Sequence, residues 1–371
     1  MRGRARLAGL AVLSSTLVAA SGLPAGARPV PATLRSASTS LSGQLFAVSA
    51  DSASDAWAVG RLPGQPSQVV LHWDGTSWSP VPIPVTGAEL FGVSAVSATN
   101  AWAVGVNNSG PVVLHWNGST WAATSAIEGN VFPEAVSADS ATDAWIVGTG
   151  DGEAHTFAWH WRGSAWTHVP APSPDSGLNA LFGVSARSPS DAWAVGFGGN
   201  NGKTLAMHWN GTSWTVVFTP NPGHISDGLS GVSAISASDA WAVGSFENPK
   251  TSRDDTLTLH WDGSAWHHVS APSPGSTSND VRAVSATSAT DVWAAGTYIN
   301  STGGRRTLSL HWNGTSWRHV PTPNPAANDF LRGVSAVSAT DAWAVGYASS
   351  RTGQQPLILH WNGTAWRQVP A

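Results

Sequence analysis

The chain lacks cysteine altogether and is poor in charge. Its 371 residues include only five Glu and two Lys, and charged residues make up 11% of the total. The absence of Cys excludes disulfide bonds, a thiol nucleophile and a metal site with cysteine ligands. No apolar run after residue 27 reaches the roughly 20 residues of a transmembrane helix, so we expect no membrane insertion by that part of the chain.

The first 27 residues have the pattern of an export signal. Arg2, Arg4 and Arg6 precede a mainly apolar stretch over 7–23, and a small-residue cleavage motif follows over 25–27. A membrane anchor is the alternative, but the stretch is short for a span. We therefore predict a secretion signal peptide over 1–27 and a secreted protein, extracellular or associated with the cell surface. Residues 28–44 are rich in Pro, Ser and Thr and are interpreted as a flexible lead-in, whose end could add a strand over 38–44.

The balance of charge argues against nucleic acid as a partner. Loss of the three arginines in 1–27 takes the basic residues from 18 to 15, against 22 acidic residues. A protein with net negative charge repels phosphate backbones. No basic amphipathic stretch indicates binding to a membrane surface either.

Tryptophan is the abundant residue, and it recurs periodically. Of the 22 Trp, 21 fall into seven copies of one repeat, and Trp159 alone lies outside the pattern. The first Trp of each copy is spaced by 43 to 52 residues from the next: Trp57, Trp102, Trp145, Trp193, Trp241, Trp293 and Trp343. Each copy contains four short apolar runs, which is typical of one propeller blade. We predict an all-β, seven-bladed β-propeller over 45–371, with four antiparallel strands per blade, and expect a monomer.

The first copy illustrates the predicted blade, with strands over 46–50, 56–60, 69–73 and 76–81. Asp74-Gly75 is interpreted as a two-residue hairpin turn, since such pairs accept positive φ at low cost. That turn would place Trp73 opposite Thr76. Alternation along strands then gives each blade two different faces, on which neighbouring blades can stack.

Each copy also repeats one His before its second Trp and, in six copies, one Asp before its first Trp. Seven histidines on seven blades cannot converge on one ion, so we interpret them as structural hydrogen-bonding groups and predict no metal site. The repeat Asp, replaced by Asn100 in the second copy, is expected to accept backbone N–H bonds in its turn. We expect no cofactor.

The segments GVSAVSATDAWAVG (333–346) and LHWNGTSW (310–317) resemble a group of uncharacterised secreted bacterial seven-repeat β-propeller proteins. The rhythm of the repeat is also distantly similar to photosystem II assembly-factor-like, Asp-box and kelch propellers. The resemblance covers 45–371 and implies the propeller architecture. It implies no activity.

Residues that vary between the copies are the candidates for function. If the first strand is innermost, the variable loops all lie on one face of the ring, and one variable first-strand position surrounds the mouth of the axial channel on that face. The residues at that position are Phe46, Phe91, Glu134, Phe182, Ser230, Arg282 and Arg332. Two interpretations of this position stay open: the Phe residues pack between blades, or the seven residues form a pocket for a polar or anionic small ligand, for which we select them as candidate binding residues. The longest loops, over 245–255, 297–306 and 347–355, add these candidates: Arg253, Asp255, Arg305, Arg306 and Arg351.

Three functions remain open from the sequence. The favoured one is non-catalytic binding of an extracellular glycan or protein through the variable-loop face. The second is a carbohydrate-active hydrolase or lyase that uses the axial pocket, although neither Tyr298 nor Tyr347 lies in a recognisable catalytic context. The third is a structural scaffold at the cell surface. We predict no catalytic residue.

Overall fold

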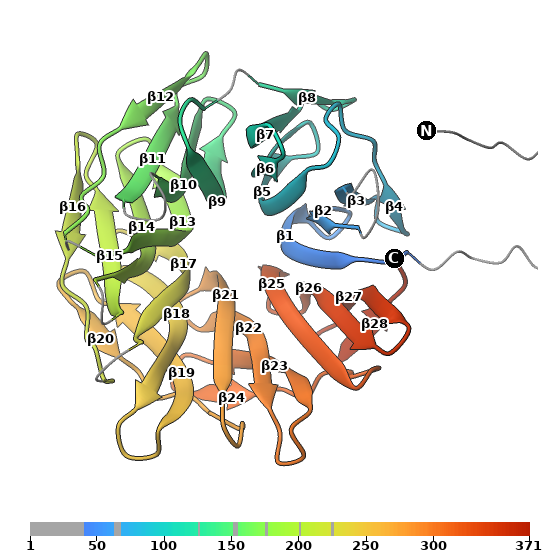
Figure 1. The fold of residues 1–371 in the computed structure, drawn as a ribbon, viewed down its shortest axis with the longest axis vertical. Coiled ribbons are helices and arrows are strands. Elements are labelled where there is room, and N and C mark those ends of the chain that lie inside the picture. The colour runs from blue at the N-terminus through green and yellow to red at the C-terminus, as the bar shows by residue number, and fades with distance from the viewer. Residues whose placement is uncertain are drawn as a thin grey trace, which may run out of the picture. The chain divides into compact units, whose positions relative to one another are not determined.

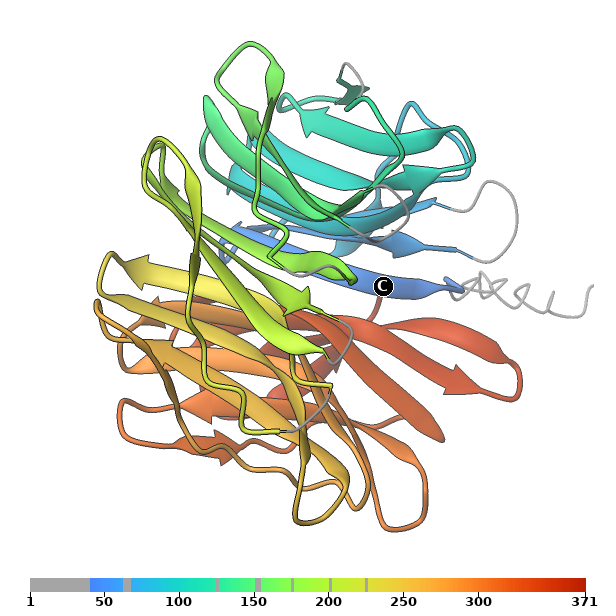
Figure 2. The same cartoon turned by 60° about the vertical axis from the view of Figure 1, so that its left-hand side comes forward.

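The computed structural model describes residues 41–62, 68–124, 127–150, 155–174, 177–199, 202–223 and 226–371. Their strands form seven four-stranded antiparallel sheets arranged in a ring, and each sheet takes its strands from one repeat in chain order (Figure 1). Turned by 60°, the sheets are seen as separate twisted blades (Figure 2). The described residues contain no helix. The predicted all-β, seven-bladed propeller with four antiparallel strands per blade is confirmed.

In every blade the first strand is innermost, and the other three follow outward. The first strands are β1 (Gln44–Ser52), β5 (Glu89–Ser97), β9 (Val131–Ser140), β13 (Asn179–Ser188), β17 (Gly228–Ser236), β21 (Asn279–Ser288) and β25 (Asn328–Ser338). The second strands are β2 (Asp55–Arg61), β6 (Asn100–Asn107), β10 (Asp143–Gly150), β14 (Asp191–Gly198), β18 (Asp239–Asn248), β22 (Asp291–Ile299) and β26 (Asp341–Ser350). The third strands are β3 (Gln68–Trp73), β7 (Gly110–Trp116), β11 (His155–Trp161), β15 (Lys203–Trp209), β19 (Arg253–Trp261), β23 (Arg305–Trp312) and β27 (Gly353–Trp361). The fourth strands are β4 (Trp78–Pro80), β8 (Trp121–Ala123), β12 (Trp166–Val169), β16 (Trp214–Val217), β20 (Trp266–His268), β24 (Trp317–His319) and β28 (Trp366–Val369).

Residues 1–40, which include the predicted signal peptide and most of the predicted lead-in, lie outside the described residues. Strand β1 begins at Gln44, one residue before the predicted start of the propeller. Residues 41–43 form no strand, so within the described part of the predicted 38–44 strand only Gln44 is extended. None of the described segments forms a helix long and apolar enough to span a bilayer.

The turn between the third and fourth strands is longer than predicted. In blade one Trp73 pairs with Trp78 and not with Thr76, so the four residues between the two tryptophans form the loop. Asp74 Oδ1 accepts hydrogen bonds from the backbone N–H groups two and three residues later, at 2.8 and 2.9 Å. Gly75 takes positive φ (91°) and Asp74 does not, whereas the predicted two-residue turn needs positive φ at both positions. The prediction was wrong because the Asp side chain, as an Asx turn, closes the loop.

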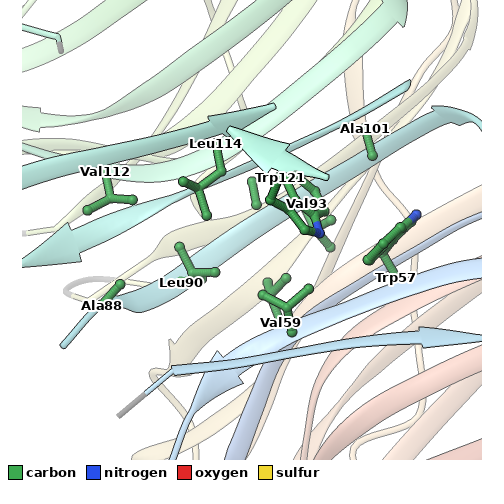
Figure 3. Close-up of a cluster of buried hydrophobic side chains, with 11 residues drawn as sticks. Trp57, Val59, Ala88, Leu90, Val93, Ala101, Val112, Leu114 and Trp121 are labelled. Atoms are coloured by element: carbon green, nitrogen blue, oxygen red, sulfur yellow. The ribbon is translucent and has the colours of Figure 1, made fainter. Parts of the chain in front are cut away.

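The hydrophobic core lies between blades, and its centre is the Trp of each second strand. Trp57 is fully buried. Its ring stacks on His72 of its own blade, with centroids 4.3 Å apart, and lies 4.8 and 5.0 Å from Trp116 and Trp121 of blade two. Small side chains of β6, such as Ala101, leave room for this indole (Figure 3). The predicted stacking of two different blade faces is therefore present.

The repeat His and the repeat Asp are partners of each other. In blade one His72 Nε2 lies 2.5 Å from Asp55 Oδ1, and the pair recurs in five further blades at 2.5 to 2.9 Å. The structural hydrogen bond predicted for the His is confirmed in these six blades. The backbone partners predicted for the Asp were wrong, because the third strand brings the imidazole to its carboxylate. In blade two the atoms Asn100 Oδ1 and His115 Nε2 are both buried without a hydrogen-bond partner among the described residues.

A second set of hydrogen bonds joins the blades around the axis. Ser49 Oγ of β1 accepts a bond from the backbone N–H of Ala95 in β5, at 2.9 Å. The same bond recurs at each of the other six interfaces, at 2.9 to 3.1 Å. The acceptors are Ser49, Ser94, Ser137, Ser185, Ser233, Ser285 and Ser335. Because Ser335 of blade seven bonds to Ala50 of blade one, this hydrogen-bonded ring is closed.

The contact between blades one and seven otherwise matches the other six. Trp343 packs against Trp73 and Trp78 with ring centroids 4.9 and 5.1 Å apart. The backbone N–H of Gly43 also donates to the carbonyl of Gln354, at 2.9 Å. Blade one therefore packs directly against blade seven, and within the described residues no strand is exchanged between them.

Candidate functional site

The mouth of the axial channel is lined as predicted. A cavity of about 280 Å³ is surrounded by one side chain from each first strand: Phe46, Phe91, Glu134, Phe182, Ser230, Arg282 and Arg332. A further space of about 150 Å³ on the axis shares these seven residues and is also bordered by first-strand valines such as Val48 and Val136. The second strands leave for their variable loops at this end of the ring. The structure therefore brings all seven predicted mouth residues together on the variable-loop face.

A β-bulge in each first strand directs these side chains into the cavity. Sequence reasoning missed this irregularity. In β1, Leu45 pairs with Gly60 and Ala47 pairs with Val59, so Phe46 is the extra residue of a β-bulge. The mouth residue of every other blade occupies the same unpaired place. A bulge bends its strand and redirects the side chain of the extra residue. Sevenfold repetition of the bulge explains why seven side chains converge on one cavity.

Glycine at the end of the second-strand motif W-A-V-G permits the bulge. At Gly346 an added Cβ would lie 1.9 Å from the carbonyl oxygen of Phe330, which is too close for any side chain. The equivalent distances are 1.8 to 2.0 Å at the other six glycines. These seven residues are Gly60, Gly105, Gly148, Gly196, Gly244, Gly296 and Gly346. The near-constant W-A-V-G motif was visible in the sequence. Its relation to the bulge could be recognised only from the pairing register of the first and second strands.

The mouth has an aromatic part and a charged part. Phe46 and Phe91 lie side by side, with ring centroids 5.9 Å apart, and Phe182 contacts Phe197 of β14 at 5.6 Å. Arg282 of β21 and Arg332 of β25 are in adjacent blades, and β9 lies across the axis from both strands (Figure 1). Ligands with an apolar portion and an anionic group match this arrangement.

The two arginines differ in their partners. Arg282 forms an ion pair with Asp280, two residues earlier, at 2.6 Å, and its Nε donates to the same carboxylate at 2.7 Å. Arg332 has no ion pair within the described residues, and its Nε has no hydrogen-bond partner there. Its guanidinium lies over the ring of Tyr347, 5.9 Å from the centroid. Arg332 is therefore the arginine whose charge is less compensated by the protein.

The ring of Tyr347 continues a stack that leads away from the mouth. Phe330 of β25 stacks on Tyr347 of β26 with centroids 4.4 Å apart and planes inclined by 18°. The guanidinium of Arg305 lies over the ring of Phe330, 5.6 Å from its centroid. Cations on both ends of an aromatic pair are held by attraction to the ring faces. The stack orders Arg332 at the mouth and connects it to the loop region of blade six.

The axial cavity has a neighbour on blades four to six. A second cavity of about 300 Å³ shares Phe182, Ser230 and Arg282 with the mouth and is also lined by Phe197 and Asp280. Arg282 thus borders both cavities, and its partner Asp280 borders the second one. Phe197 and Asp280 belong to this site although sequence reasoning did not select them. Asp280 lies two residues before Arg282 on β21, and alternation along a strand places both side chains on the same face.

The predicted loop residues line neither of these cavities. Three of them form contacts within the protein, and two are exposed. Asp255 is buried and accepts a bond from Asn248 at 2.7 Å, and Arg253 lies 3.8 Å from it. Arg306 donates to the backbone carbonyls of Ala326 and Ala327 at 3.2 and 3.0 Å. These three side chains stabilise loops.

Two of the predicted loop residues are exposed. Arg305 caps the stack described above, and Arg351 lies in the turn between β26 and β27. Both are positioned for contact with a partner on the variable-loop face, and this role stays a prediction. Among the described residues, no group of three His, Asp or Glu side chains is arranged to hold a metal ion.

No family model and no curated protein matches this chain. Solved structures do. A structure of YCF48 bound to a D1 peptide superposes with a TM-score of 0.54 at 15% identity, over 86% of this chain and 92% of that one. YCF48 from Cyanidioschyzon merolae gives 0.52 at 15% identity, over 86% and 94%. A GH74 xyloglucanase from Xanthomonas campestris gives 0.59 at 14% identity, over 89% of this chain and 53% of the enzyme. At such identities the likeness shows the fold alone, and at that level it supports the distant resemblance to assembly-factor-like propellers.

Proposed function

We propose that this protein is a secreted, non-catalytic binding module that takes up a peptide segment of a partner protein at the axial mouth. The observation that carries the proposal is the convergence of three Phe, Arg282 and Arg332 on one cavity of about 280 Å³. A space of that size holds one or two side chains and not a folded domain or a long glycan. The remaining contacts would come from the variable-loop face around it.

The chemistry of the mouth favours a peptide that presents a carboxylate next to an apolar side chain. Arg332 offers guanidinium donors without a competing ion pair among the described residues, and a charge-assisted, bidentate bond to a carboxylate is among the strong hydrogen bonds in proteins. Phe46 and Phe91 supply apolar surface at the same cavity. The exposed Arg305 and Arg351 would add attraction over the same face, chiefly to the association rate.

Among the solved structures compared above, YCF48 was captured with a peptide bound, which is consistent with peptide recognition on this fold. The hydrolase alternative requires a pair of carboxyl groups flanking the bond that is cleaved. Among the described residues that line the mouth, Glu134 is the single carboxylate. No observation favours a structural scaffold over a binding module.

The test is a selection of random decapeptides with free C-terminal carboxylates on the immobilised full-length chain. Selected peptides are expected to combine an acidic group with an aromatic or aliphatic side chain. Fluorescence anisotropy should then show at least tenfold weaker binding to an Arg282→Ser, Arg332→Ser double variant. The matched control is Arg318→Ser with Arg367→Ser, which removes the same charge from exposed positions on outer strands. Equal affinities for the two double variants would contradict the proposal.

A further inference from the structure

Trp159 is the tryptophan that the repeat does not require. It lies on β11, directly before the repeat His160. In the other six blades the equivalent position holds a fully buried aliphatic side chain or Met207: Leu71, Leu114, Met207, Leu259, Leu310 and Leu359. Trp159, in contrast, is only half-buried. Because leucine suffices for packing at this position in five blades, packing alone does not explain the indole.

The larger indole borders a cavity that lies away from the axis. That cavity has a volume of about 600 Å³ and lies between β11, β12 and the segment 128–131 that leads into β9. The ring of Trp159 contacts the imidazole of His168 edge-on, with centroids 5.7 Å apart. Glu128, Asn130 and His155 complete the polar part of the lining. The cavity shares no residue with the axial mouth.

Three polar side chains of this cavity are available to a ligand. Glu128, Asn130 and His155 are exposed and form no hydrogen bond or ion pair within the described part of the chain. Ser173, by contrast, is already engaged, because its Oγ accepts the backbone N–H of Thr156 at 3.0 Å. A carboxylate, an amide and an imidazole together can donate to and accept from vicinal hydroxyl groups.

This combination has the chemistry of a site for neutral sugar. A Trp ring offers a flat apolar face to the C–H groups of a pyranose, while the surrounding polar groups replace water at its hydroxyls. No Arg or Lys lines the cavity within the described residues, and Glu128 adds negative charge, so an anionic ligand is disfavoured. The volume is in the range of sites that hold small organic ligands, which corresponds to about two sugar rings.

We propose that the blade-three cavity binds a neutral oligosaccharide, with Trp159 as the stacking platform and Glu128, Asn130 and His155 as hydroxyl partners. This glycan site is separate from the peptide site proposed at the axial mouth, and either proposal can fail alone. It would give the module two different contacts on one rigid ring.

The decisive variant is Trp159→Leu, because leucine is the residue that five other blades carry at this position. It should fold and melt like the natural protein. The full-length chain is tested by saturation-transfer NMR against pooled di- to tetrasaccharides of neutral β-glucan, xyloglucan, mannan and chitin, at millimolar concentration. We expect at least one pool to bind, Trp159→Leu to weaken that binding at least tenfold, and Trp159→Phe to weaken it less.

The control is the Arg282→Ser, Arg332→Ser variant, which should retain sugar binding unchanged while losing the peptide. The proposal is overturned by the absence of binding from every neutral pool. It is equally overturned by sugar binding that Trp159→Leu leaves intact, or by a Trp159-dependent ligand from the decapeptide selection in place of a sugar.

Discussion

The blade interfaces and the axial mouth are both built seven times from one repeat. They differ in how much their residues vary between the seven copies. At the interfaces the second-strand Trp is present in all seven blades and its exposure never exceeds 1%. At the mouth the equivalent residue is Phe in three blades, Arg in two, and Glu or Ser in one each. Identical backbone geometry, the β-bulge, therefore presents different chemistry around the axis.

This difference separates stability from function. Each interface residue is enclosed by neighbouring blades, so any change there disturbs close packing. Each mouth residue points from a bulge into a cavity, so its side chain can change while the ladder on either side stays paired. Trp159 follows the same logic at another position, where one blade departs from the leucine of the repeat beside a cavity. Departures from the repeat that border a cavity are thus the best guide to binding residues here.

The largest expected effect comes from breaking an interface. Trp193→Ala removes an indole that packs against His208, Trp261 and Trp266, and such truncations cost about 3–5 kcal/mol of unfolding free energy. Arg332→Ala at the mouth should cost less than about 1 kcal/mol. Urea denaturation of both variants measures the contrast, and similar losses would show that the mouth is part of the stabilising core.

A smaller effect is expected at the glycine that permits the bulge. Gly346→Ala places a Cβ 1.9 Å from the carbonyl oxygen of Phe330, and the necessary backbone shift should cost about 1–3 kcal/mol. It should also weaken peptide binding, because the same bulge aims Arg332. Gly304→Ala is the control, since its nearest contact would be an ordinary 3.4 Å. A Gly346→Ala protein with natural stability and affinity would contradict the role given to the bulge.

The smallest expected effect is a pH dependence of stability. It is tested by comparing two aspartates on the face of the ring opposite the variable loops. Burial, followed by the nearby carboxylate of Asp143, raises the pKa of Asp139 to about 6. The ordinary pKa of an Asp side chain is about 3.9. Below pH 4 the carboxyl group of Asp139 is protonated in the folded and in the unfolded chain, and the folded state carries no penalty. As the pH rises through 6 this carboxyl group ionises in the folded protein, and the free energy of unfolding falls. Asp139 is partly exposed, and solvent screening limits the penalty at pH 7 to about 1 kcal/mol.

Asp139→Asn should therefore stabilise the protein at pH 7 and flatten its stability between pH 4 and 7. Asp74→Asn is the control. Hydrogen bonds from Thr76 and from backbone N–H groups lower the pKa of Asp74 to about 2, outside this pH window. Chemical denaturation at several pH values provides the measurement. An unchanged slope in Asp139→Asn would show that the two carboxyl groups do not interact as described.

Much of this architecture could be predicted from the sequence, because one pattern repeated seven times averages out local ambiguity. The blade number, the strand order and the seven mouth residues followed from periodicity and alternation. Features that depend on exact register did not follow. The hairpin loop was two residues too short in prediction because Asp74 caps the turn with its side chain, an interaction that competes with the backbone turn type.

Partners across strands were equally hidden. Asp55 was expected to serve its own turn, but the imidazole of His72 reaches it from a strand 17 residues away. Arg282 was expected to be open to ligand, but Asp280, two residues earlier on the same strand, forms an ion pair with it. The loop arginines were grouped by charge, although Arg306 is held by backbone carbonyls. In each case the residue type was informative, while its partner was set by tertiary geometry.

The most direct test of whether binding at the mouth is separate from stability is calorimetric melting of a variant without charges at the mouth, with and without a selected decapeptide. Glu134→Ser, Arg282→Ser and Arg332→Ser together install the residue that blade five already carries at Ser230. We expect this variant to melt within about 4 °C of the natural protein, and we expect peptide to raise the melting temperature of the natural protein only. A variant that no longer folds, or one that peptide stabilises as strongly as the natural protein, would contradict the separation of binding from stability.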